Sequence, residues 1–186
     1  VCPGNIAANS ENGLCSASGI VINLPVTNDN CGIDTIFNDA PLSFPVGITT
    51  ITHTVIDIHG NTKTCAQIVE ITDTELPEIS CPVGINTSAD ANSCMATNVQ
   101  LGTPAIHDNC GIDTMFNDAP SVYPVGTTVV TYTVKDIHGN IAQCTQQVTV
   151  TDNEKPAISC PGTINLTADP GSCFAGNILP GTPTVS

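Results

Sequence analysis

The spacing of the cysteines constrains this chain more than any other feature of its sequence. The ten cysteines lie at positions 2, 15, 31 and 65, then at 81, 94, 110 and 144, and finally at 160 and 173. Adding 79 to the first four positions gives the next four, and adding 79 to positions 81 and 94 gives the last two. Such a period predicts a tandem array of small domains, with repeat 1 at residues 1–76, repeat 2 at 77–155 and a partial repeat 3 at 156–186. Since a third of a repeat is not expected to fold alone, we expect the array to be longer than this chain or the last segment to pack on another chain.

Longer motifs recur with the same period. The segment DNCGIDTIFNDAP at Asp29 to Pro41 returns as DNCGIDTMFNDAP at Asp108 to Pro120, with Met115 in place of Ile36 as the single change. FPVGITTITHTVIDIHGN likewise returns as YPVGTTVVTYTVKDIHGN. Segments this similar are predicted to share one fold.

The repeated segments have the two-residue periodicity of β-strands. In VVTYTVKD, Val130, Tyr132 and Val134 alternate with polar residues, and Ile51, His53 and Val55 do the same in repeat 1. Because successive side chains of a strand point to opposite faces, this pattern predicts strands with one buried face.

Turn residues separate the predicted strands. The segment QCTQQVTVT is predicted to be a strand with Val148 and Val150 on its buried face, and DIHGN is predicted to be the hairpin turn before it, with Gly139 at positive φ. Further strands are predicted at Gly19 to Leu24, at Asn98 to Gly102 and from each GIDT. About seven short strands per 79-residue repeat, without helical periodicity, predict an all-β fold of tandem immunoglobulin-like β-sandwiches.

Composition excludes several functional classes. With 17 acidic residues against 3 lysines and a net charge of -14, the chain is not expected to bind nucleic acid. Its apolar stretches are too short for a membrane span. Ten cysteines without zinc-site spacing indicate disulfides, and therefore an extracellular or cell-surface location.

No pattern of catalytic residues is visible, so an enzyme is not predicted. There is no nucleophile elbow, phosphate-binding loop or Ser-His-Asp order. His59 and His138 recur in the DIHGN turns, but a turn histidine beside glycine is typical of a solvated loop.

Taken together, the motifs resemble those of a known family. Repeat 2 has, in this order, ISCP, ADxxSC, DNCG, a PVG segment, DxxGN and TDxExP; repeat 1 has the last four of these, and the partial copy has the first two. This order is similar to that of the hyalin repeat (HYR) domain, and the four-cysteine version with DNCG resembles repeats of large bacterial surface proteins. The resemblance implies an extracellular immunoglobulin-like module, often in tandem, associated with adhesion and matrix rather than catalysis.

All the cysteines are predicted disulfide residues: Cys2, Cys15, Cys31, Cys65, Cys81, Cys94, Cys110, Cys144, Cys160 and Cys173. In an immunoglobulin-like sandwich the DNCG loop and the DIHGN hairpin lie at one end and the Cys15 turn at the other. This placement favours Cys31 with Cys65, Cys110 with Cys144, and bridges between repeats from Cys15 to Cys81 and from Cys94 to Cys160. The alternative, in which every bridge lies within one repeat, stays open.

Acidic residues are predicted to gather where repeats meet, and calcium is the cofactor that they suggest. Calcium takes six to eight oxygen ligands, and the linkers TDTELP and TDNEKP resemble cadherin linkers in which calcium stiffens successive domains. The predicted ligands are Asp73, Glu75, Asp108, Asn109, Asp113, Asp136, Asp152 and Glu154. The alternative is that these residues only cap turns and confer solubility.

Four positions are predicted to carry glycans. Asn86 and Asn165 lie in Asn-x-Ser/Thr sequons at equivalent places, and Thr35 and Thr114 lie in Asp-Thr-aliphatic strings that resemble a bacterial O-glycosylation motif. Ordinary strand surface is the alternative explanation.

Two functions agree with these features. The first is a structural component of an extracellular fibre, filament or surface array, whose partners are copies of itself or neighbouring repeats. The second is a passive spacer in a large secreted adhesin or enzyme.

Overall fold

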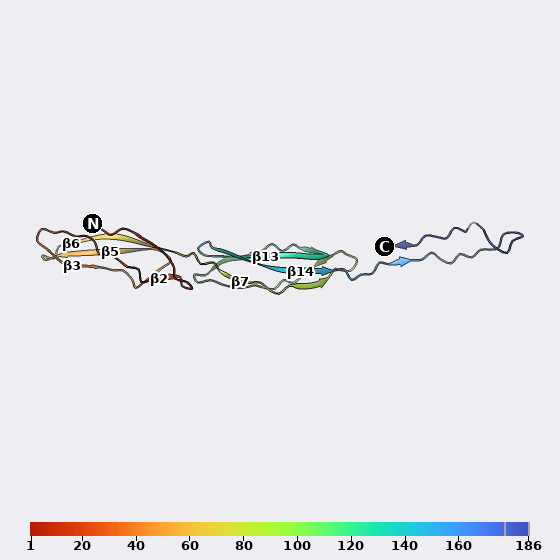
Figure 1. Ribbon diagram of the computed structural model, residues 1–186, viewed down its shortest axis with the longest axis horizontal. Coiled ribbons are helices and arrows are strands. Elements are labelled where there is room, and N and C mark those ends of the chain that lie inside the picture. The colour runs from red at the N-terminus through yellow and green to blue at the C-terminus, as the bar shows by residue number, and fades with distance from the viewer. Residues whose placement is uncertain (177, 186) are drawn as a thin grey trace.

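The computed structural model, which describes residues 1–176 and 178–185, is an all-β structure of units arranged end to end (Figure 1). The first unit holds six strands: β1 (Ile6–Asn9), β2 (Ser16–Ser18), β3 (Ile33–Asn38), β4 (Ser43–Pro45), β5 (Gly47–Asp57) and β6 (Thr62–Thr72). The second holds eight: β7 (Glu78–Ser80), β8 (Ile85–Ser88), β9 (Met95–Thr97), β10 (Ala105–His107), β11 (Ile112–Asn117), β12 (Val122–Pro124), β13 (Gly126–Asp136) and β14 (Ile141–Thr151). Within the described residues, no helix is long and apolar enough to span a membrane.

Both units have the same two-layer sandwich topology. A four-stranded sheet, in the order β1-β6-β5-β3 or β8-β14-β13-β11, faces a two-stranded sheet, β2-β4 or β9-β12. β1 pairs in parallel with β6, and β8 pairs in parallel with β14, whereas the other pairs are antiparallel. In the second unit β7 and β10 form an additional pair.

The predicted core residues are buried between the layers. Ile51 and His53 of β5 and Val130, Tyr132 and Val134 of β13 are at most 1% exposed, whereas Val55 of β5 is only partly buried. Val148 and Val150 of β14 are buried as well, so the predicted periodicity of these strands is confirmed.

A glutamine that the apolar pattern did not indicate lies in each core. Gln146 accepts a hydrogen bond from the Tyr132 hydroxyl at 3.0 Å, and its Nε2 donates to the Val83 carbonyl at 2.7 Å. In the first unit Gln67 makes the equivalent contact with His53, at 2.9 Å. Buried polar groups need such partners, and both glutamines have them, whereas His53 Nδ1 is buried without one. Burial raises the pKa of the Tyr132 hydroxyl, which stays neutral.

The predicted strands at Gly19 to Leu24 and Asn98 to Gly102 are wrong. Gly19 has φ +66° and Asn98 has φ +52°, so each ends the preceding strand instead of beginning a new one. The apolar residues that follow, such as Ile20 and Val99, still pack against the cores from irregular segments. Gly139 has the predicted positive φ, at +98°, in the turn between β13 and β14.

The described part of residues 156–185 lies beyond the second unit as a long, open hairpin (Figure 1). Its strands β15 (Ile158–Ser159) and β16 (Thr184–Val185) pair with each other. Neither core cluster includes any of its described residues, and Phe174 and Leu179 are 73% and 90% exposed.

Candidate functional site

Three disulfides organise the chain, and one of them joins the two sandwiches. The bonded pairs are Cys2–Cys65, Cys81–Cys144 and Cys15–Cys110. The first two are equivalent bridges within a repeat, each with a sequence separation of 63. The third has a separation of 95 and connects the turn before β2 with the DNCG turn before β11.

The predicted pairings are therefore wrong, although the prediction of a bridge between repeats is right. Cys65 and Cys144 bond to the cysteine that precedes β1 or β8 of their own repeat, because β1 runs beside β6 and β8 runs beside β14. This arrangement leaves Cys110 at the end of repeat 2 that faces Cys15. The remaining four cysteines have exposed, unbonded thiols: Cys31, Cys94, Cys160 and Cys173.

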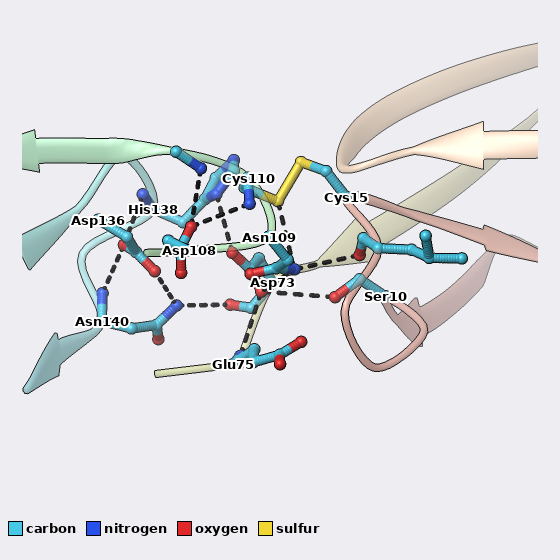
Figure 2. A network of polar contacts seen from close by, with 12 residues as sticks. Ser10, Cys15, Asp73, Glu75, Asp108, Asn109, Cys110, Asp136, His138 and Asn140 are labelled. Carbon is cyan, nitrogen blue, oxygen red and sulfur yellow. Dashed lines mark hydrogen bonds and ion pairs between the residues drawn. A yellow bond between two sulfur atoms is a disulfide. The ribbon is translucent and has the colours of Figure 1, made fainter. Parts of the chain in front are cut away.

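Asp73 lies at the centre of the junction beside this bridge (Figure 2). It follows β6, and its side chain is fully buried. Its Oδ1 accepts hydrogen bonds from the Glu75 backbone N–H at 3.1 Å, from Asn109 Nδ2 at 3.3 Å and from the Ser10 hydroxyl at 3.4 Å. Its Oδ2 lies 3.2 Å from His138 Nδ1. One linker carboxylate thus contacts both repeats.

Two more aspartates approach Asp73 from turns of repeat 2 (Figure 2). Asp108 Oδ1 accepts the backbone N–H groups of Cys110 and Gly111, at 2.9 and 2.8 Å. Asp136, fully buried, accepts bonds from the backbone and the side chain of Asn140. Burial raises the pKa of Asp136, but these bonds and those from the turn backbone outweigh burial, so the pKa is lowered. The carboxylate is therefore charged at neutral pH.

The junction brings together four of the eight predicted calcium ligands. Carboxylate oxygens of Asp73, Asp108 and Asp136 lie within 4.8 Å of one another. Asp108 Oδ2 and Asn109 Oδ1 are buried without a hydrogen-bond partner, although buried oxygens normally have one. This set of oxygens suits a hard cation such as calcium. Cys110 also lies near Asp73, but its sulfur is already in a disulfide.

The other four predicted ligands lie elsewhere. Glu75 Oε2 accepts the backbone N–H of Gly13 at 2.7 Å, and Asp113 pairs with Lys135 on an exposed part of β11 and β13, at 3.7 Å. Asp152 and Glu154 are at the far end of repeat 2, where they repeat the local bonds of Asp73 and Glu75. Binding of a cation stays a prediction.

The predicted glycosylation residues are all exposed. Thr35 lies on β3, Thr114 on β11 and Asn86 on β8, while Asn165 lies in the open segment beyond repeat 2. Their exposure is compatible with modification, and their glycosylation stays a prediction.

Sequence reasoning missed several junction residues. His138 contacts Asp73, Asn140 Nδ2 donates to the Asp73 carbonyl at 3.3 Å, and the Leu14 carbonyl accepts a hydrogen bond from the predicted residue Asn109 at 3.1 Å. The recurrence of DIHGN was a signal for His138 and Asn140, because a turn that is repeated at the same end of each repeat can contact the neighbouring repeat. Ser10 carried no such signal.

Comparison with known proteins shows what the second repeat is similar to. Residues 72–150 match the family model described as HYR domain, over a segment that has the length of the repeat period. Two proteins named hyalin are similar over most of the chain: that of Lytechinus variegatus is 33% identical over 192 residues, and that of Strongylocentrotus purpuratus is 32% identical over 195. These alignments cover 91% and 94% of this chain but only 34% and 15% of the two relatives.

Other similarities are shorter or more distant. The Rattus norvegicus protein named "Sushi, von Willebrand factor type A, EGF and pentraxin domain-containing protein 1" is 35% identical over 91 residues, which are 46% of this chain and 2% of that protein. Extracellular cadherin domains 1–4 of protocadherin gamma B7 align at 12% identity and a TM-score of 0.36, over 90% of this chain and 55% of that one.

These relatives are animal proteins, so the comparisons do not support the bacterial character that the DNCG motif implied. The HYR assignment itself has independent support from the family model and from both hyalins. Residues 72–150, which include most of the repeat-2 fold and the internal Cys81–Cys144 bridge, are thus similar to the HYR domain family.

Proposed function

We propose that this chain is a structural, non-catalytic module whose repeats are coupled end to end, and that it serves as a stiff element of an extracellular fibre, filament or surface array. The Cys15–Cys110 bridge carries the proposal. It adds a second covalent connection beside the linker, and two connections restrict bending and twisting more than one. Disulfides persist outside reducing compartments, which supports the extracellular location.

The hydrogen bonds around Asp73 support the same function. Asp73 bonds to Ser10 of its own repeat and to Asn109 and His138 of the next, so both repeats hold one buried group. Domains joined by a single linker are expected to move relative to each other unless such an interface holds them. The junction therefore combines a covalent bond with a polar interface.

Removing the bridge is expected to loosen the junction without unfolding the repeats. In a Cys15→Ser/Cys110→Ser variant, small-angle X-ray scattering should show a smaller radius of gyration and the loss of the longest interatomic distances, because the repeats can then bend at the linker. The circular dichroism spectrum should not change. A Cys31→Ser/Cys94→Ser variant, which replaces two unbonded cysteines, is the matched control. Identical scattering from both variants would contradict the proposed role of the bridge.

We also propose that the junction binds calcium through Asp73, Asp108, Asn109 and Asp136. The two buried, unpartnered oxygens of Asp108 and Asn109 support this proposal, because a cation would satisfy both. The cation would also offset the repulsion among three carboxylates that lie within 4.8 Å of one another.

Calcium is expected to raise the melting temperature of the chain by about 3 to 6 °C at a concentration ten times the dissociation constant. A chelator should reverse the shift, and Asp108→Asn should abolish it. Asp113→Asn removes an equal charge from an exposed strand and should leave the shift intact. The calcium proposal fails if millimolar calcium has no effect on the wild type, or if Asp108→Asn responds like Asp113→Asn.

The spacer function is the second candidate. The aligned segment is 2% of the rat relative, whose name includes several other domain types, so similar segments occur within multidomain proteins. The complete protein sequence distinguishes the fibre function from the spacer function. Repeats along the whole protein favour a fibre, whereas a terminal binding or catalytic domain favours a spacer.

A further inference from the structure

The junction bridge joins the two turns that hold the proposed calcium ligands. Cys110 directly follows two of these ligands, Asp108 and Asn109. Its partner Cys15 ends the turn that contacts a third ligand, Asp73. We infer that the bridge and the cation site are energetically coupled through Asn109, so that the closed bridge strengthens calcium binding and bound calcium stabilises the bridge against reduction. This inference rests on the proposed calcium site and adds a redox dependence to it.

On the repeat-2 side, one turn fixes Asp108 and Cys110 relative to each other. Asp108 Oδ1 accepts the backbone N–H of Cys110 at 2.9 Å and that of Gly111 at 2.8 Å. The other oxygen of this carboxylate, Oδ2, is buried without a hydrogen-bond partner and is free to bind a cation. A displacement of Cys110 therefore displaces an oxygen of the site.

Asn109 connects the bridge to the site most directly (Figure 2). Its Nδ2 donates to the carbonyl of Leu14, the residue before Cys15, at 3.1 Å, and to Asp73 Oδ1 at 3.3 Å. The same nitrogen lies 3.6 Å from the Cys110 sulfur. These contacts orient the amide, whose Oδ1 is buried without a partner. One side chain thus contacts repeat 1 beside the bridge and offers an oxygen to the cation.

On the repeat-1 side, the turn that ends at Cys15 holds Asp73 in two ways. The Ser10 hydroxyl donates to Asp73 Oδ1 at 3.4 Å. The Gly13 N–H donates to Glu75 Oε2 at 2.7 Å, and the Glu75 N–H donates to Asp73 Oδ1 at 3.1 Å. The position of Asp73 therefore depends on this turn, which the bridge fixes against repeat 2.

Ligands that are already assembled bind a cation more tightly than ligands that binding must first bring together. With the bridge closed, carboxylate oxygens of Asp73, Asp108 and Asp136 lie within 4.8 Å of one another. With the bridge open, the linker is the single covalent connection between the repeats, so calcium must also hold the two turns together. By thermodynamic linkage, the bridge strengthens calcium binding by the same factor by which calcium favours the closed bridge. We expect a factor of at least about five, as is typical of such couplings.

Opening the bridge requires a two-electron reductant, and a low-molecular-weight thiol such as glutathione is the class that supplies it. One glutathione thiolate attacks a sulfur of the bridge, forms a mixed disulfide and releases the thiolate of the other cysteine. A second glutathione thiolate attacks the glutathione sulfur of the mixed disulfide and releases the remaining cysteine thiolate. The cysteine thiolates take up the protons that the glutathione thiols lost. Two glutathione thiols are oxidised to one glutathione disulfide, and the bridge is reduced to two thiols.

Isothermal titration of the full chain with calcium measures the coupling from the side of the cation. Cys15→Ser/Cys110→Ser should raise the calcium dissociation constant at least about five-fold relative to the wild type. Cys31→Ser/Cys94→Ser keeps the bridge, is the matched control and should leave the constant unchanged. Equal constants in the wild type and the bridge variant would overturn the inference and leave the calcium site standing. Absence of calcium binding to the wild type would overturn both.

A glutathione redox buffer measures the same coupling from the side of the bridge. Thiols are alkylated at equilibrium, and peptide mapping gives the ratio of bonded to reduced Cys15–Cys110. Saturating calcium should raise this ratio at least about five-fold at a fixed ratio of glutathione to its disulfide. The Cys2–Cys65 bridge, closed within repeat 1, is the internal control and should not respond. Asp108→Asn should abolish the effect on Cys15–Cys110, and an effect that persists in this variant would contradict coupling through the site.

Asn109→Asp tests the route of the coupling. The substitution keeps an oxygen for the cation but removes the Nδ2 group that donates to Leu14 and to Asp73. Calcium should still bind, whereas the factor by which bridge removal raises the dissociation constant should fall to less than half of its wild-type value. An undiminished factor would overturn the assignment of the coupling to Asn109.

Discussion

Replacing Cys81 and Cys144 together by serine is expected to lower the free energy of unfolding of repeat 2 by about 4 kcal/mol. The bridge closes a loop with a sequence separation of 63, and the chain-entropy model gives a loop of this length a stabilisation of that size. A domain of this size buries a limited apolar core and has few kilocalories of net stability. We therefore expect the variant to be close to unfolded at physiological temperature.

Tyrosine fluorescence measures this loss in repeat 2 alone. The chain has no tryptophan, and its two tyrosines, Tyr123 and Tyr132, are both buried in the repeat-2 core. Denaturant titration of the variant should shift the tyrosine transition to much lower denaturant concentration. The equivalent variant of repeat 1, Cys2→Ser/Cys65→Ser, should leave that transition nearly in place. A shift of less than about 1 kcal/mol, or equal shifts in the two variants, would be incompatible with the assigned bridges.

Stretching the chain between residues 1 and 151 should show no long unfolding step while the bridges are intact. The force then passes through the disulfide of each repeat, so the 63-residue segment that the disulfide closes cannot be extended. After reduction, each repeat should add a step of about 220 Å, since an extended residue spans about 3.5 Å. A fibre built from such repeats would resist extension as long as its disulfides survive.

Force spectroscopy with and without a reductant measures these steps. Cys15→Ser/Cys110→Ser is the informative control, because it opens the junction and leaves both internal bridges in place. It should give no 220 Å step under oxidising conditions. Steps of that length in the oxidised wild type would rule out the internal pairing.

The strand pattern of this protein was predictable because it is local. The alternation at Val130, Tyr132 and Val134 predicted which side chains enter the core, and all three are buried. The errors at Gly19 and Asn98 were also local: one residue at positive φ ended a strand where apolar alternation suggested that a strand would begin. Irregular chain can bury alternating apolar residues as well, so alternation alone did not separate the two.

The candidate site was predictable only in part. Asp73, Asp108, Asn109 and Asp136 are brought together because the linker of one repeat meets the DNCG and DIHGN turns of the next, as the repeat order suggested. Asp113 was misplaced because a bulge in β11 between Ile112 and Thr114 turns it towards Lys135.

The sequence by itself determined the period of 79, the all-β class, the buried faces of the long strands and the turn at Gly139, since each depends on residues within a few positions of one another. The tertiary structure alone decided the disulfides. Whether Cys110 bonds to Cys144 of its own repeat or to Cys15, 95 positions away, depends on which strand passes beside it and which domain end faces it. Identical DNCG turns therefore differ in bonding: Cys110 contacts a neighbouring repeat and is bonded, while Cys31 contacts none among the described residues and is unbonded.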